Sequence, residues 1–93
     1  MLEKDVKKAL RTYLDKIGAY QYWPVPMGYG AKTVDVLVCY KGKFYAIETK
    51  RPGVKAPTMA QNIVFSKIQN AGGAVILENS IFLETTRAVL GET

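Results

Sequence analysis

Residues 34–50 read VDVLVCYKGKFYAIETK, and this stretch decides the fold. It holds two runs rich in β-branched and aromatic residues, 34–40 and 44–50, with a short polar interruption at 41–43. Such a pattern predicts two antiparallel strands joined by a tight turn. Both faces of the hairpin are apolar, which is typical of central strands in a sheet that helices cover on both sides.

The position of the turn determines which residues face each other. A two-residue turn at Lys41-Gly42 places Asp35 directly opposite Glu48, with both carboxylates on one face of the hairpin. A three-residue loop with a bulge is the alternative, and it places Asp35 opposite Ile47. Facing carboxylates have Cβ atoms about 5 Å apart and repel each other unless a cation neutralises them.

Lys50 completes a D…ExK arrangement with this pair. It lies two residues beyond Glu48, so it projects from the same face, roughly 7 Å further along the strand. Two carboxylates suit Mg²⁺, and a neighbouring ammonium can orient a water or offset phosphate charge. An ExK triplet on a strand often has no function: its charged side chains lie on a solvated edge or form a cross-strand ion pair. Here the charges lie in apolar strands, where an unpaired charge is costly, and this favours a function.

Composition narrows the class of protein. The 93 residues suit one domain, spanning 1–93, and thirteen Lys and Arg against eight Asp and Glu give a net charge of +5. This charge suits nucleic acid, although many small basic proteins bind none. The absence of histidine excludes His-dependent triads, zinc sites and nucleases with a His base. Cys39, the single cysteine, excludes an internal disulfide and is expected to be a buried small apolar residue.

The N-terminal segment predicts an amphipathic helix. Apolar side chains recur at three- and four-residue intervals over 2–17, and Gly18 is suited to end the helix. Glu3 falls on the apolar stripe. It either complements the positive end of the helix dipole or serves as a third acidic ligand. The segment has no secretory signal and no run reaches membrane-spanning length, so we expect a soluble cytoplasmic protein.

An aromatic strand is expected over 19–23, and two loops, 24–33 and 51–57, adjoin the hairpin. Long loops in small domains are commonly functional. Four side chains in these loops either contact nucleic-acid phosphates or are simply solvated: Tyr29, Lys32, Arg51 and Lys55.

The C-terminal half predicts helix, strand and helix. Thr58 is suited to cap a helix reaching about residue 71, with Gln61 directed towards the sheet. Gln61 makes either a structural hydrogen bond or a contact in the site. The apolar run 74–78 is expected to be a strand parallel to its neighbour, because a helix precedes it. Ser80 is expected to cap a terminal helix over 80–90.

The element order α-β-β-β-α-β-α, with these acidic residues, the ExK triplet and the glutamine, resembles the PD-(D/E)xK nuclease superfamily. Within it, the chain resembles the virus-type replication-repair nuclease (VRR-NUC) domain over essentially its whole length. The resemblance implies a restriction-endonuclease-like α/β fold, with a central mixed sheet flanked by helices, and Mg²⁺- or Mn²⁺-dependent phosphodiester hydrolysis. The site residues it implies are Glu3, Asp35, Glu48, the Thr49 carbonyl, Lys50 and Gln61. Val34 stands where the family usually has a proline that shapes the backbone without taking part in the chemistry.

The expected function is a DNA endonuclease that acts as a homodimer on branched DNA, with the four-way junction as its best substrate, in the cytoplasm of a bacterial or phage-infected cell. The alternatives are a nucleic-acid-binding or assembly module with an idle site, and a nuclease of unspecific or RNA preference. Five side chains are candidates for a dimer interface, with core packing as the alternative for about half of them: Tyr20, Tyr22, Trp23, Ile81 and Phe82.

Overall fold

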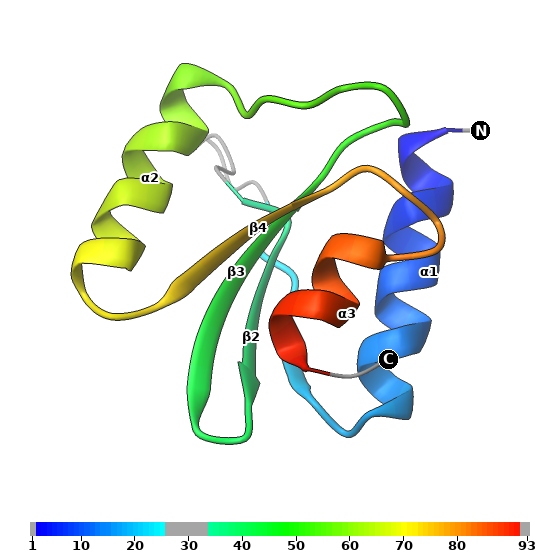
Figure 1. Cartoon of the computed structure of the whole chain (residues 1–93), viewed down its shortest axis with the longest axis horizontal. Coiled ribbons are helices and arrows are strands. Elements are labelled where there is room, and N and C mark those ends of the chain that lie inside the picture. Colours follow the sequence, from blue (N-terminus) through cyan, green and yellow to red (C-terminus); the bar gives the residue numbers. More distant parts are fainter. Residues whose placement is uncertain (1, 26–33, 92–93) are drawn as a thin grey trace.

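The computed structural model describes residues 2–25 and 34–91, which form one mixed sheet between helices (Figure 1). The elements are α1 (Glu3–Lys16), β1 (Tyr20–Tyr22), β2 (Val36–Tyr40), β3 (Lys43–Thr49), α2 (Met59–Asn70), β4 (Ala74–Glu78) and α3 (Glu84–Leu90). The strand order is β1-β2-β3-β4, and β4 is parallel to β3 while the other pairs are antiparallel. The expected element order and mixed sheet are confirmed. No helix among the described residues is long and apolar enough to cross a membrane.

The β2–β3 hairpin has the register that a two-residue turn predicts. Val36 pairs with Ile47, and both residues of the turn Lys41-Gly42 have positive φ, 50° and 79°. Positive φ at both central residues is the geometry of the type I′ turn, which matches the twist of the strands. The alternative with a bulge is therefore wrong. One step beyond the ladder, Asp35 and Glu48 face each other at the end of the hairpin away from the turn.

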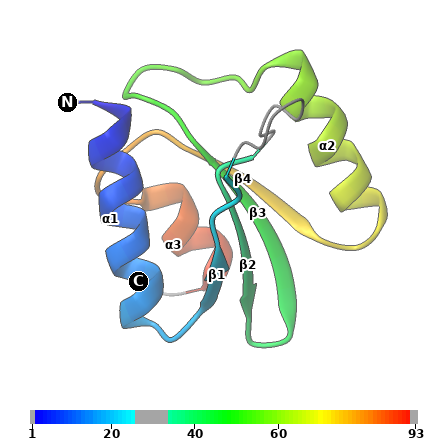
Figure 2. The same cartoon turned by 180° about the vertical axis from the view of Figure 1, so that it is seen from behind.

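Helices cover the two faces of the sheet unequally. Figure 2, seen from behind, shows α1 and α3 on one side of the sheet and α2 on the other. The larger core lies under α1 and α3, and its fully buried members include Leu10, Leu14, Val36, Ile47 and Ile76. The smaller core lies under α2 and consists of Val34, Ala46 and Phe65, with partly buried neighbours.

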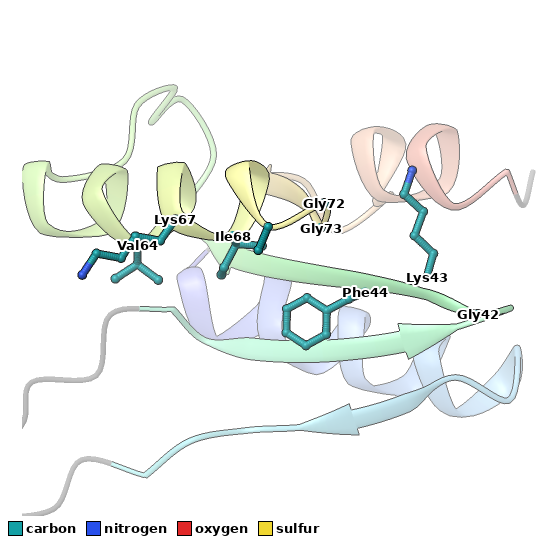
Figure 3. A pocket seen from close by; sticks show the side chains of 9 residues that line it. Gly42, Lys43, Phe44, Val64, Lys67, Ile68, Gly72 and Gly73 are labelled. Carbon is teal, nitrogen blue, oxygen red and sulfur yellow. The ribbon is translucent and has the colours of Figure 1, made fainter.

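The α2 side of the sheet stays open near the hairpin turn. Cys39 and Phe44 are both exposed there, and a hollow of about 480 Å³ lies between Phe44 and the C-terminal end of α2 (Figure 3). Gly73 also lines this hollow, and a Cβ at this position would come within 2.7 Å of an Ile68 side-chain carbon, so a larger residue would need a shift of its neighbour. The expectation that Cys39 is buried is wrong, because α2 does not cover the part of β2 that carries it.

The segment after β4 differs from the predicted helix. Ser80 is not a helix cap; its hydroxyl accepts a hydrogen bond from the backbone of Phe82 at 3.0 Å, within a turn. The N-cap of α3 is Leu83, which has left-handed backbone. The fully buried Glu78 carboxylate accepts hydrogen bonds from the N–H and the hydroxyl of Thr86 in the first turn of α3. Glu78 thus supplies the acceptor that we expected from Ser80.

Candidate active site

Asp35 and Glu48 are the central residues of the candidate site. The two residues are 2% and 5% exposed, although both are acids. Asp35 immediately precedes β2 and Glu48 lies near the end of β3, so the hairpin brings them together at one edge of the α2 face. Burial of two facing carboxylates is costly unless each is hydrogen-bonded or a cation neutralises them.

Asp35 is held from two sides. Its Oδ2 accepts hydrogen bonds from the backbone N–H of Thr49 at 2.9 Å and from the Thr49 hydroxyl at 2.5 Å. Its Oδ1 lies 3.4 Å from Nζ of Lys7, which is also 3.5 Å from a Glu3 oxygen. Glu3 therefore joins the site through Lys7. Sequence reasoning missed Lys7; the available signal was its position four residues after Glu3, one turn along the same helix.

Glu48 has one well-satisfied oxygen and one unsatisfied oxygen. Its Oε2 accepts a hydrogen bond from Nε2 of Gln61 at 2.5 Å and lies 3.5 Å from Nζ of Lys50. Its buried Oε1 has no hydrogen-bond partner among the residues that the structure describes. A buried acceptor without a donor is uncommon and calls for an explanation such as a bound ion or water.

Gln61 has both of the roles considered from the sequence. Its backbone N–H and side-chain oxygen form a capping box with Thr58 at the start of α2, over distances of 3.2 and 2.9 Å. The capping box fixes the side chain, and its remaining N–H₂ group points at Glu48. The helix cap thereby positions the Glu48 carboxylate.

The site is short of positive charge beside Glu48. Burial raises the pKa of the Glu48 carboxyl above its usual 4.5, and repulsion from Asp35 raises this pKa further, while Lys50 and Gln61 offset only part of the shift. For Lys7, burial lowers the pKa, but the carboxylates of Asp35 and Glu3 outweigh it and leave the pKa raised. A cation next to Glu48 would relieve this imbalance.

The raised pKa of Glu48 predicts how the metal-free protein responds to pH. The protonated form suits the fold better, so its stabilising contribution is complete below pH 4.5 and is lost as the pH rises through the higher folded pKa. Glu48→Gln removes this dependence. In chelator, we expect the variant to gain melting temperature relative to wild type as the pH rises above 4.5. A pH series by circular dichroism measures this; parallel curves for the two proteins would contradict it.

Six of the ten predicted site residues come together in the structure. The residues that contacts link at the end of the hairpin are Glu3, Asp35, Glu48, Thr49, Lys50 and Gln61. Arg51 and Lys55 are exposed on the loop that follows β3. Tyr29 and Lys32 lie outside the described residues.

The carboxylate oxygens of the site suit a hard divalent cation, but two carboxylates do not fill its coordination shell. Asp35 and Glu48 offer carboxylate oxygens, and the buried Oε1 of Glu48 has no donor within the described part of the chain. The described residues contain no group of three or more Asp, Glu, Cys or His side chains arranged to hold a metal ion. A cation would therefore complete its coordination with backbone carbonyl, water or substrate oxygens, as Mg²⁺ commonly does.

Comparison with known proteins gives a match in structure. No protein-family model and no curated protein matches the sequence. A solved structure described as a "VRR_NUC domain" superposes with a TM-score of 0.71 over 86% of this chain and 86% of its own, at 20% sequence identity. The resemblance drawn from the sequence is thus confirmed for the fold. The chain has the restriction-endonuclease-like α/β fold of a VRR_NUC domain.

Proposed function

We propose that this protein is a metal-dependent DNA endonuclease that hydrolyses phosphodiester bonds. The observation that carries the proposal is the buried Asp35–Glu48 pair. Oε1 of Glu48 lacks a donor among the described residues, and Oε2 lies 3.5 Å from the Lys50 ammonium. Such a cluster costs stability and suits a site for a cation and a phosphate. The fold shared with a VRR_NUC domain supports the same conclusion.

Asp35 and Glu48 would hold Mg²⁺ or Mn²⁺, with the Thr49 carbonyl and Glu3 as further ligands. The ion, when bound, supplies charge neutralisation at the phosphate and lowers the pKa of a water. The N–H and hydroxyl groups of Thr49 fix the Asp35 carboxylate, and Gln61 fixes that of Glu48. Both ligands are thus oriented before substrate arrives, which lowers the reorganisation needed for reaction.

Lys50 has an orienting and electrostatic role in this proposal. Its ammonium can donate three hydrogen bonds and, while protonated, has no lone pair for a metal. It adjoins Glu48 on the same strand face, so it can direct a water towards the phosphorus atom and offset the charge that develops on the phosphate oxygens. The water loses a proton to solvent as its oxygen forms the new P–O bond, and the P–O bond to the leaving sugar oxygen breaks as that oxygen takes up a proton from solvent.

The same proposal includes a homodimer that prefers four-way junctions. One site cuts one strand, whereas junction resolution needs two symmetric cuts, which a two-fold dimer supplies. Tyr20 and Tyr22 on edge strand β1 are 68% and 53% exposed, which suits an interface. Trp23 does not, because it packs against the core with the Arg11 guanidinium 4.5 Å above its ring.

A substrate panel of equal-length single strand, duplex, flap and four-way junction tests this preference, with light scattering at micromolar concentration for the mass. We expect a dimer that cuts the junction fastest, with binding that weakens steeply as salt rises. A monomer that cuts linear duplex as well as junctions would contradict the preference and the assembly.

Lys7→Met is expected to tighten binding of Mn²⁺ roughly tenfold. Lys7 neutralises Asp35 and Glu3 in the metal-free protein, so its ammonium opposes an arriving cation at short range. Without Lys7, the buried Asp35 also loses a charge partner, and the metal-free melting temperature should fall. Calorimetry and thermal denaturation measure both effects. Lys8→Met, at an exposed position on the same helix, is the matched control and should change neither. Unchanged or weaker Mn²⁺ binding by Lys7→Met would refute the effect.

A further inference from the structure

The turn between β4 and α3 holds a large aromatic side chain out of the core. Phe82 is 69% exposed, yet its backbone is fixed at both ends: its N–H donates to Oγ of Ser80 at 3.0 Å, and its carbonyl accepts from Nε of Arg87 at 3.1 Å. The next residue, Leu83, is buried with a φ of +55°, an unfavourable conformation for a residue other than glycine. A strained backbone directly after an exposed aromatic residue is a reason to look for a ligand.

Phe82 borders a hollow whose lining begins two residues after Lys50 of the candidate site. The hollow, of about 460 Å³, lies between the turn and the loop that follows Lys50, and Lys55 lines it. One hydrogen bond joins its two walls: the Asn79 side chain donates to the Val54 carbonyl at 2.8 Å. Just before the walls begin, the Lys50 N–H donates to the Glu78 carbonyl at 2.9 Å. In Figure 1, the green loop after β3 and the orange connection after β4 both reach the α1 side of the molecule.

A second hollow lies beside the first, and its lining is basic. It has a volume of about 630 Å³, lies between the turn and α1, and shares Ile81 with the first hollow. The cations in its lining are Lys8, Lys16 and Arg87, and its acid is Asp5. The Asp5 carboxylate also accepts a hydrogen bond from the backbone of Leu2 at 2.8 Å, at the start of α1. The charge of this surface is complementary to a polyanion.

We propose that Phe82 and the two hollows beside it form a track for an unpaired nucleic-acid strand that leaves the active site. A base stacks on the exposed ring of Phe82, while Lys55 on one side and Lys8 and Arg87 on the other meet the phosphates. A positively charged groove with an exposed aromatic ring is the combination that binds single strands without sequence preference. The inference rests on the proposed nuclease function and adds an unpaired strand, which a fully paired four-way junction lacks, to the features of a branched substrate that the protein binds.

Charge distinguishes this occupant from a second copy of the chain. The chain carries a net charge of +5, and a two-fold contact through this surface would bring the face that carries Lys8, Lys55 and Arg87 against the same basic face of the partner copy. Like charges across an interface disfavour association. A nucleic-acid strand gains from the same charges, so the basic lining favours the strand.

The test is binding of two four-way junctions by the full chain in chelator, where no cleavage is expected: one with fully paired arms and one with an unpaired tail. Fluorescence anisotropy of labelled junctions gives Kd. We expect Phe82→Ala to bind the tailed junction roughly tenfold more weakly, with Phe82→Trp near wild type. The paired junction should be bound by all proteins alike. Phe44→Ala removes an exposed phenylalanine at the far end of the sheet and is the matched control.

Each outcome bears on the track separately from the nuclease function. Wild-type affinity of Phe82→Ala for the tailed junction, with Mg²⁺-dependent cleavage intact, would overturn the track and leave the nuclease in place. A halved mass of Phe82→Ala in light scattering would also overturn it, because Phe82 would then belong to an interface between copies. Failure of the wild-type protein to cut any substrate would instead count against the proposed function, whatever Phe82 binds.

Discussion

Glu48→Gln is expected to lower the rate of DNA cleavage at least about a thousandfold while the fold is kept. The substitution replaces a ligand charge with a neutral amide of almost the same shape, so the proposed cation loses a main source of binding and orientation. The free energy of unfolding without metal should be unchanged or raised, because the substitution ends the repulsion between Asp35 and Glu48. Single-turnover cleavage of a labelled junction and thermal denaturation measure the two quantities.

Two further variants sharpen this result. Glu84→Gln removes the same charge from an exposed position and should cut like wild type. Asp35→Ala should also abolish cleavage, but it leaves the buried N–H and hydroxyl of Thr49 without their acceptor. We therefore expect it to lose about 1–3 kcal/mol of stability, unlike Glu48→Gln. Rapid cleavage by Glu48→Gln would mean that this carboxylate is not part of the reacting site.

Lys50→Ala is expected to lower the rate of DNA cleavage by about a hundredfold or more and to leave metal binding intact. Protonated lysine carries no lone pair for a metal, and its ammonium, 3.5 Å from Glu48, opposes a cation there. Calorimetry with Mn²⁺ should show an affinity equal to or greater than that of wild type. Lys43→Ala, at an exposed position on the same strand, is the control and should leave both quantities unchanged. Complete loss of Mn²⁺ binding by Lys50→Ala would instead give Lys50 a role in shaping the site.

Local rules predicted the hairpin and limited its register to two alternatives. The structure has the register of the two-residue turn at Lys41-Gly42, and the two-residue period of strands then sets Asp35 against Glu48. The N-cap at Thr58 likewise predicted where α2 begins and placed Gln61 in its first turn. In each case neighbouring residues in the sequence determine most of the geometry, and only the choice between the two turns of the hairpin needed the structure.

The wrong expectations depend on contacts between distant parts of the chain. Cys39 is exposed because α2 leaves the region near the hairpin turn uncovered, and strand periodicity gives no information about how far a helix extends over a sheet. Ser80 does not cap α3 because a fully buried glutamate on β4, Glu78, accepts the hydrogen bonds of its first turn. Lys7 was overlooked for the same reason: its contact with Asp35 joins α1 to the start of β2.

The most direct test of the central claim is cleavage of a four-way junction by the wild-type protein in Mg²⁺ and in excess chelator. The buried Asp35–Glu48 pair, with Lys50 beside it, predicts cleavage in Mg²⁺ and none in chelator, with activity restored when Mg²⁺ is added back. Undiminished cleavage in excess chelator would contradict the account, because the reaction would then need no cation at the carboxylate pair.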